Sequence, residues 1–448
     1  DLGGRLSAVT VADGKVFVAA VDRHTVHALS ADTGREAWQF AAGGRVDSPP
    51  TFFDGRVLFG SADGYVYCLR AADGELAWRF RAAPTDRRTL VYEQVESLWP
   101  VHGSVLVREA EAWFVAGRSL FVDGGMRLFR LNARTGEVVS QTVLDEKDPR
   151  TGKNIQGTVQ WLNMAVGRPD VLSCDGERIY MRSQAFDLAG QRLNLGPTLT
   201  GPQEGTQQGG ERTHLFCPTG FLDDTWFHRT YWMYGQTWSS GWNGYYIAGK
   251  HAPAGKILCV GEDLVYAFGR QPQYYRWTTP MEFRLFAAQK QWKAADPAAE
   301  RRSAPQPEAP AKAGKKGRKK AEGPLPITNK GNYAWTTEVP VLVRAMVLAG
   351  ASTGSGQGKT LFIAGPRDVL DESARGKQPV GEDKLLLQQE AGLAGKDGGV
   401  LWAVSAADGS RLREIVLDSP PVFDGLAAAG GRLYLVTMDG KVRCFGGR

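Results

Sequence analysis

Residues 56–80, RVLFGSADGYVYCLRAADGELAWRF, contain a complete strand–turn–strand–turn–strand unit. The segments RVLFG and YVYCL place apolar side chains at the two-residue spacing of a β-strand. The dipeptides Asp63-Gly64 and Asp73-Gly74 supply the positive φ angles that tight hairpin turns require. Trp78 then closes the unit. The stretch therefore predicts three consecutive antiparallel strands.

The same unit occurs forty positions earlier, in residues 15–40, KVFVAAVDRHTVHALSADTGREAWQF, with Trp38 at the place of Trp78. A period near forty residues with four short strands is typical of a propeller blade. Four further blade-like units can be recognised, at residues 104–139, 159–188, 399–417 and 420–447. We predict an all-β fold, a propeller of about seven four-stranded antiparallel blades with six or eight left open, forming one domain over residues 1–448. Trp38 and Trp78 should lie buried between neighbouring blades.

The two ends of the chain are incomplete repeats, because the last unit lacks its tryptophan strand and the chain begins just before a repeat. Propellers commonly close by pairing both ends in one blade, and we expect that closure here. The chain has five scattered cysteines, with no C-x-x-C motif: Cys68, Cys174, Cys217, Cys259 and Cys444. We expect buried free thiols, and Cys68 and Cys444 occupy equivalent places in two repeats.

The repeat in residues 6–80 resembles the repeat of the PQQ-type, quinoprotein-like β-propellers, in its S-x-D-G-x-V-Y-x-L and D/T-G-x-x-x-W-x-F segments. That family includes the quinoprotein alcohol dehydrogenases and the BamB-type outer-membrane assembly lipoproteins. The resemblance implies a ring of four-stranded blades and leaves an enzyme and a scaffold both open, since a fold alone does not decide function.

Two segments interrupt the repeat. The segment TDRRTLVYEQVESLWP, residues 85–100, is predicted to be a loop or short helix that covers one mouth of the channel. Residues 293–332 are rich in Ala, Pro, Lys and Gly, and we predict a disordered, dispensable insertion there. Its ten Lys or Arg residues against four Asp or Glu residues account for the net charge of +6, so the rest of the chain is close to neutral. A nucleic-acid partner is therefore not expected.

Residues 226–246 are the largest departure from the repeat, because nine of these twenty-one residues are aromatic. The aromatic side chains either pack beneath an enlarged loop or form a binding surface. For the binding surface we select these candidate residues: Asp223, Asp224, Trp226, His228, Arg229, Trp238 and Trp242. Trp238 and Trp242 are the leading candidates, since they flank a Ser-Ser-Gly loop that can project their indoles.

The sequence contains few of the features that would indicate a catalytic site. The vicinal cysteine pair that usually accompanies a catalytic quinoprotein of this resemblance is missing, and no ordered set of acidic and amide calcium ligands is recognisable. The six histidines show no metal-binding spacing, and there is no G-x-S-x-G elbow. We expect no cofactor and no metal site, while PQQ and Ca²⁺ belong to the alternative below.

These observations favour a non-catalytic binding or scaffold propeller of the bacterial cell envelope, located in the periplasm or outside the cell. The alternative is a divergent PQQ- and Ca²⁺-dependent quinoprotein oxidoreductase that acts on alcohols or sugars. A protein partner or a small carbohydrate-like ligand fits the first interpretation, and we expect a monomer. No transmembrane segment is predicted, because no apolar run approaches the roughly 20 residues of a membrane span.

Overall fold

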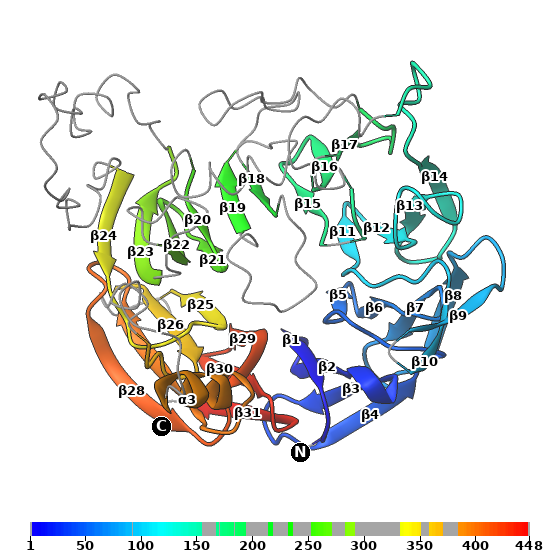
Figure 1. Ribbon diagram of the computed structural model, residues 1–448. Coiled ribbons are helices and arrows are strands. Elements are labelled where there is room, and N and C mark those ends of the chain that lie inside the picture. The colour runs from blue at the N-terminus through cyan, green and yellow to red at the C-terminus, as the bar shows by residue number, and fades with distance from the viewer. Residues whose placement is uncertain are drawn as a thin grey trace, which may run out of the picture.

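The chain folds into a ring of short antiparallel sheets around a central axis (Figure 1). The computed structural model describes residues 2–91, 93–154, 167–169, 171–182, 184–193, 214–217, 232–235, 252–270, 283–291, 332–350, 358–370 and 384–446. All statements about the structure concern these residues. None of the candidate residues chosen between Asp223 and Trp242 is among them, and neither is the predicted insertion at residues 293–332 except Asn332.

The first four sheets follow one another along the chain, and each consists of strands that are neighbours in sequence. The first sheet contains β1 (Leu6–Ala12), β2 (Lys15–Ala20), β3 (Thr25–Ser30) and β4 (Glu36–Ala41), with the 3-10 helix η1 (Val21–Arg23) between β2 and β3. The second contains β5 (Thr51–Phe53), β6 (Arg56–Gly60), β7 (Tyr65–Arg70) and β8 (Leu76–Arg81). The third contains β11 (Leu106–Arg108), β12 (Glu111–Ala116), β13 (Met126–Asn132) and β14 (Val138–Leu144). The fourth contains β15 (Ser173–Cys174), β16 (Arg178–Met181) and β17 (Gln184–Asp187).

The remaining four sheets complete the ring in the same order of strands. The fifth sheet contains β18 (His214–Phe216), β19 (Trp232–Gly235) and β20 (Ala254–Gly255). The sixth contains β21 (Ile257–Val260), β22 (Leu264–Arg270), β23 (Phe283–Gln289) and β24 (Tyr333–Thr337). The seventh contains β25 (Ala345–Ala349), β26 (Thr360–Gly365), β27 (Gly399–Ser405) and β28 (Arg411–Leu417). The eighth contains β29 (Pro421–Ala429), β30 (Arg432–Thr437) and β31 (Lys441–Gly446).

The all-β propeller architecture predicted from the repeat is confirmed, but the described strands form eight blade-like sheets instead of the best estimate of seven. The difference arises between residues 214 and 270, where the fifth and sixth sheets both begin. Strands β18 and β20 have only three and two residues, and no Asp-Gly hairpin signal marks them. The sequence pattern therefore could not separate two sheets in this region.

The hydrophobic core lies between neighbouring sheets. Clusters of buried side chains join the first sheet to the second, the second to the third and the seventh to the eighth. Trp38 is 7% exposed and Trp78 is half-buried, so burial between blades is confirmed for Trp38 and is only partial for Trp78. Each indole reaches the following sheet, where Trp38 Nε1 donates to the carbonyl oxygen of Ala71 at 3.0 Å.

Both chain ends meet at the eighth sheet, where the N–H groups of Leu2 and Gly3 donate to the carbonyl oxygen of Gly440 at 2.9 and 3.1 Å, and the expected pairing of both ends in one blade stays a prediction. Strand β31 pairs with β30, and β1 is the innermost strand of the first sheet, which is a separate sheet. Among the described residues, the first and eighth sheets pack against each other, because β1 lies beside β29 and Leu6 joins Val436 in one apolar cluster. All five cysteines are free. Cys68 and Cys217 are buried, but Cys444 is exposed, contrary to expectation, because no described strand covers the outer edge of β31.

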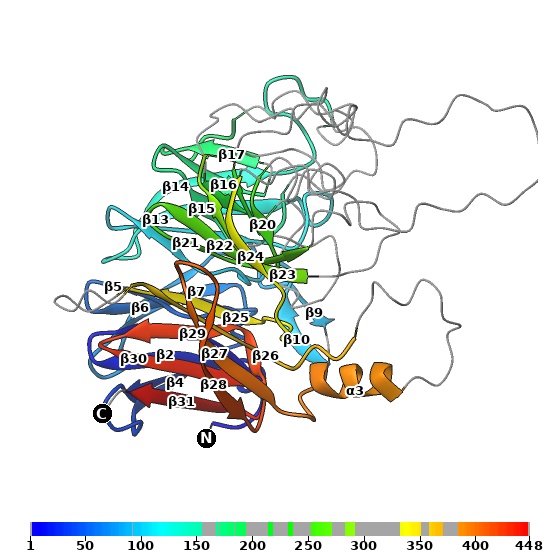
Figure 2. The same ribbon diagram turned by 90° about the vertical axis from the view of Figure 1, so that its left-hand side faces the viewer.

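The insertion at residues 85–100 contains a β-hairpin, which corrects the prediction of a loop or short helix. It consists of β9 (Arg88–Val91) and β10 (Gln94–Ser97). The connection between β26 and β27 contains the helix α3 (Lys384–Leu393). Figure 2 shows that the hairpin and α3 project from the same face of the ring. None of the described helices has the length and apolar character to span a membrane.

Candidate functional site

The β9–β10 hairpin has an inverted polarity. Val95 pairs with Leu90 across the two strands, and these apolar side chains are 54% and 73% exposed. Glu96, the next residue along β10, points to the other side and is only 1% exposed. A surface hairpin ordinarily buries its apolar face and exposes its charges. This hairpin buries Glu96 and presents Leu90 and Val95 to solvent, beside the exposed charges of Arg88 and Glu93.

Arginines explain why Glu96 can be buried. Arg45 Nη2 lies 3.0 Å from Glu96 Oε1, and Arg118 Nη2 forms an ion pair with the other carboxylate oxygen of Glu96. Arg45 also contacts Asp47, with 2.7 Å between its Nε and Asp47 Oδ1. A buried charge is tolerated when it is paired and hydrogen-bonded in this way. The two arginines therefore fasten the hairpin to the body of the propeller.

Asp47 and His102 extend this group of charges. His102 Nδ1 lies 2.5 Å from Asp47 Oδ2, and His102 Nε2 lies 3.4 Å from Arg118 Nη1. Burial raises the pKa of the Asp47 carboxyl group, but hydrogen bonds and charges from His102 and Arg45 outweigh burial and lower this pKa to about 2. Asp47 is therefore ionised throughout the physiological pH range. We call Arg45, Asp47, Glu96, His102 and Arg118 the ion network.

A second apolar segment lies beside the hairpin, in the connection between β12 and β13. Arg118 Nη2 donates to the carbonyl oxygen of Ser97 at 3.3 Å, and Trp99 Nε1 donates to that of Asp123 at 3.1 Å. Within this connection Phe121 is 47% exposed and Val122 is 53% exposed. The contacts of Arg118 and Trp99 hold the two segments together. We call Leu90, Val95, Phe121 and Val122 the hairpin surface.

Helix α3 repeats this polarity on the same face of the ring (Figure 2). Its three consecutive leucines, Leu385, Leu386 and Leu387, are 48%, 37% and 60% exposed. Gln389 is buried instead, where its Oε1 accepts from the backbone N–H of Val369 at 2.9 Å and its Nε2 donates to the carbonyl of Arg367 at 3.1 Å. The helix is thus fixed by a polar side chain, while its three leucines are partly exposed.

The chemistry of the ion network does not resemble a catalytic site. Asp47 and His102 form an acid–histidine pair, but the other imidazole nitrogen faces Arg118 rather than a nucleophile. The nearby Ser48 hydroxyl donates to the carbonyl oxygen of His102 at 2.5 Å. Among the described residues, no group of three or more His, Cys, Asp or Glu side chains could hold a metal ion. The network can brace a surface through its ion pairs, although two of its buried atoms, Glu96 Oε1 and Arg118 Nε, make no hydrogen bond.

The sequence pattern did not indicate these residues. The candidates selected from the sequence lie outside the described residues and stay predictions: Asp223, Asp224, Trp226, His228, Arg229, Trp238 and Trp242. The segment LVYEQVES shows no regular alternation of apolar and charged residues that could have marked its buried face. The partners of Glu96 could not be read from the sequence, because Arg45 and Arg118 are 51 positions before and 22 positions after it.

Comparison with known proteins finds a family match in the first half of the chain. Residues 1–208 match the family model described as outer membrane protein assembly factor BamB. A curated BamB from Moranella endobia (strain PCIT) is 34% identical over 70 residues, which is 16% of this chain and 18% of that protein. The match thus spans less than a fifth of the length of that relative.

Solved structures with a similar shape are more distant. BamB from Moraxella catarrhalis aligns with a TM-score of 0.45 at 11% identity, over 99% of this chain and 94% of that one. Quinohemoprotein alcohol dehydrogenase from Comamonas testosteroni aligns with a TM-score of 0.49 at 14% identity, over 97% of this chain and 70% of that one.

Proposed function

Because the chain is a PQQ-type β-propeller repeat protein, we propose that it is a non-catalytic, protein-binding scaffold of the bacterial cell envelope. Its partner takes part in outer-membrane protein assembly, as the name of the family matched by residues 1–208 suggests. This assignment places the chain in the periplasm or on the outside of the cell, and we propose that the chain acts there as a monomer. The hairpin surface lies within the matched residues, so the proposed binding site and the family similarity coincide.

The observation that carries the proposal is the inverted polarity of the β9–β10 hairpin. Leu90 and Val95 are exposed while Glu96 is buried, although the opposite arrangement would remove more apolar area from water. Exposed apolar groups on a rigid, polar-anchored support are typical of protein-binding surfaces. A partner that covers Leu90 and Val95 would recover the hydrophobic free energy that the isolated chain does not gain.

The test is a capture experiment with detergent-solubilised outer-membrane proteins of the source bacterium. We compare the wild-type chain with a double variant, Leu90→Glu and Val95→Glu. A matched control carries Leu412→Glu and Val416→Glu on the outermost strand β28, where the side chains are 60% and 72% exposed. Mass spectrometry quantifies the captured components of outer-membrane protein assembly.

We expect the hairpin variant to capture these components at least tenfold less than the wild type, since each buried carboxylate placed in an apolar contact costs more than the roughly 1.4 kcal/mol that a tenfold change requires. The β28 control should capture them normally. Equal capture by all three folded proteins would contradict the proposal.

The proposal needs no cofactor. Treatment with EDTA should therefore leave capture unchanged, and incubation with PQQ and Ca²⁺ should give no dye-linked oxidation of alcohols or sugars above background. Clear turnover would contradict the non-catalytic assignment and favour an oxidoreductase.

A further inference from the structure

The base of the β9–β10 hairpin is fixed on the turn between β6 and β7. The backbone N–H of Ser97 donates to the carbonyl oxygen of Ala62 at 2.8 Å. Gly64, in that turn, has a φ of 87°, and a Cβ atom added to it would come within 2.8 Å of both Ala83 Cβ and Ser97 Oγ. This close packing brings the end of β8 and the start of β9 to one place on the surface.

Four exposed arginines gather at this place. Arg79 and Arg81 lie on β8, while Arg87 stands directly before β9 and Arg88 begins it. Tyr65 lies between the two groups, because Arg81 is its partner in the β7–β8 ladder and the guanidinium carbon of Arg79 lies 5.3 Å from the centre of its ring. We call these four arginines the arginine patch.

The arginine patch has fewer acids than it needs for balance. Arg88 Nε lies 3.0 Å from Asp86 Oδ1. The hydrogen bond and the charge of Asp86 raise the pKa of Arg88, and the charge of Asp63 adds to this rise. The other three arginines make no ion pair with any described residue. Four positive charges against two negative charges leave an excess of two.

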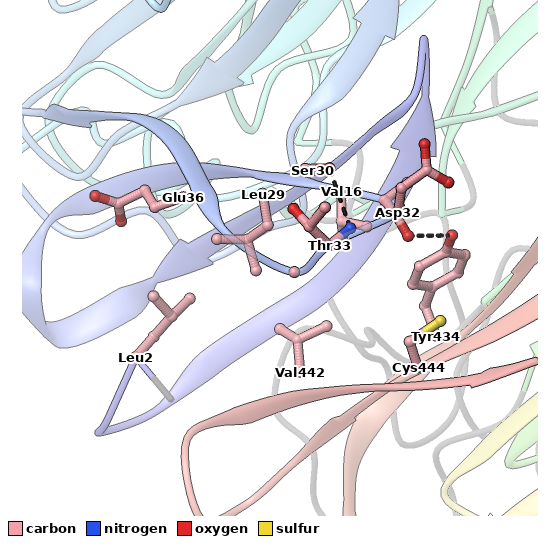
Figure 3. A pocket seen from close by; sticks show the side chains of 12 residues that line it. Leu2, Val16, Leu29, Ser30, Asp32, Thr33, Glu36, Tyr434, Val442 and Cys444 are labelled. Atoms are coloured by element: carbon pink, nitrogen blue, oxygen red, sulfur yellow. Dashed lines mark hydrogen bonds between the residues drawn. The ribbon is translucent and has the colours of Figure 1, made fainter.

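Charged groups at another junction of the ring are matched within the chain. A pocket of about 470 Å³ lies between the first and eighth sheets, and the acids that line it are Asp32 and Glu36 (Figure 3). Asp32 Oδ1 lies 2.6 Å from Arg432 Nη1, and Glu36 Oε2 lies 2.6 Å from His27 Nδ1. Both acids thus have a partner in the chain itself, whereas the arginine patch can accept acids from another molecule.

The arginine patch is continuous with the hairpin surface. Arg88 and Leu90 are two residues apart on β9, so their side chains project from the same face of the hairpin. Val95 lies opposite Leu90 in the ladder. Arginine is enriched in protein interfaces, and its planar guanidinium group binds a carboxylate through two parallel hydrogen bonds. This combination of side chains is suited to a partner that is both aliphatic and acidic.

The tip of the hairpin carries the opposite charge. Glu93, in the turn between β9 and β10, has a φ of 63° and is exposed. A uniformly anionic surface, such as a membrane of acidic lipids, would be attracted by the arginine patch but repelled by Glu93. A protein segment can place its acids at the base of the hairpin and keep them away from the tip. The pattern of charges therefore favours a protein.

We propose that the partner segment that covers the hairpin surface is acidic. Its aliphatic side chains contact Leu90 and Val95, and its Asp or Glu carboxylates bind the guanidinium groups of the arginine patch through bidentate hydrogen bonds. This inference rests on the proposed protein-binding function and adds the chemistry of the partner to it.

The first test repeats the capture from detergent-solubilised outer-membrane proteins with Arg87→Glu. The matched control is Arg413→Glu, because Arg413 is likewise exposed, forms no ion pair with a described residue and lies beside the exposed Leu412 on β28. We expect Arg87→Glu to capture the partner about tenfold less than the wild type, since the reversed charge repels the carboxylates of the partner. Arg413→Glu should capture it normally. Equal capture by both variants would overturn the proposal.

Salt should act on the wild-type protein in the same direction. Raising the NaCl concentration from about 0.1 M to about 1 M shortens the screening length from about 10 Å to about 3 Å. Capture by the wild type should therefore fall, while the weak capture by Arg87→Glu should change little. Capture by the wild type that does not depend on salt would contradict an acidic partner.

The second test identifies the contacting group. Arg87→Lys keeps the positive charge and supplies a primary amine, so this variant should still capture the partner. A carbodiimide then joins that amine to a carboxylate in contact with it, and mass spectrometry identifies the joined peptides. We expect an amide bond between position 87 and an Asp or Glu residue of the captured protein, and none from the control Arg413→Lys. Cross-links from position 87 to acids of the same chain alone would overturn the proposal.

The two proposals fail in different ways. If the variant with Leu90→Glu and Val95→Glu captures as much as the wild type, the hairpin surface is not the binding site and the proposed function fails. If that variant loses capture while Arg87→Glu keeps it, the binding site stands and the acidic partner is wrong.

Vesicles of phosphatidylethanolamine and phosphatidylglycerol examine the membrane as the alternative. We expect neither the wild type nor Arg87→Glu to float with these vesicles. Flotation of the wild type but not of Arg87→Glu would show that the arginine patch binds lipid headgroups, and it would overturn the proposal.

Discussion

At the scale of single residues, the tryptophans that close the blades differ in burial. Trp38 is 7% exposed and packs within the cluster between the first two sheets, whereas Trp78 is half-buried. We expect Trp38→Ala to lower the free energy of unfolding by about 3–5 kcal/mol, and Trp78→Ala to lower it by less, because less area is lost from the core. Urea unfolding of both variants measures the difference. Equal losses would show that the indole hydrogen bond, which both residues make, outweighs burial.

Asp47 gives the chain a defined dependence on pH. Its folded-state pKa of about 2 is below the ordinary value of 3.8, so its contribution to stability is fully present above about pH 4 and is lost as the pH falls towards 2. A difference of nearly two pKa units corresponds to about 2 kcal/mol. We therefore expect wild-type stability to fall by about that amount more than the stability of Asp47→Asn over this interval. Denaturation curves at pH 4.5 and pH 2.5 measure this, and parallel losses in both proteins would refute the role of Asp47.

At the scale of elements, the β9–β10 hairpin depends on one buried carboxylate. Removing the charge of Glu96 leaves Arg45 and Arg118 without their shared anion, and breaking a buried pair in this way typically costs about 3–5 kcal/mol. We expect Glu96→Gln to increase amide hydrogen exchange in the hairpin and in residues 117–125 while the distant seventh sheet stays protected. Glu93→Gln, an exposed position of the same hairpin, is the control. Unchanged exchange in Glu96→Gln would mean that the ion network does not hold the hairpin.

The hairpin is also the kind of element that could not be predicted from the sequence. The blades could be predicted because each contains its own turn signals and strand spacing within about forty residues. The hairpin lies in an insertion with no counterpart in the repeat, and its strands are only four residues long. Its stability comes from arginines of other segments, which a local pattern does not reveal. The same reasoning applies to α3, whose fixed contacts are made by Gln389 with residues 367 and 369.

At the scale of the whole molecule, eight described sheets close into a ring by packing β1 against β29. The incomplete repeats at both ends indicated that the ends meet, but which strands of the first and eighth sheets are neighbours could be seen only in the structure.

One expectation for the whole molecule lies outside the described residues. Deletion of residues 293–332 should leave the melting temperature nearly unchanged, since the segment lacks the apolar residues of a core. A melting temperature lowered by many degrees in calorimetry would contradict it.

The central claim is that the hairpin surface binds a protein partner in the cell envelope. The most direct measurement places a photoreactive amino acid at Leu90 in the full chain expressed in the source bacterium, with Leu412 on β28 as the reference position. After irradiation, cross-linked products are identified by mass spectrometry. The account predicts a specific cross-link from position 90 to a protein of the outer-membrane assembly machinery, and none from position 412. Cross-links of the same identity and yield from both positions, or none from position 90, would contradict it.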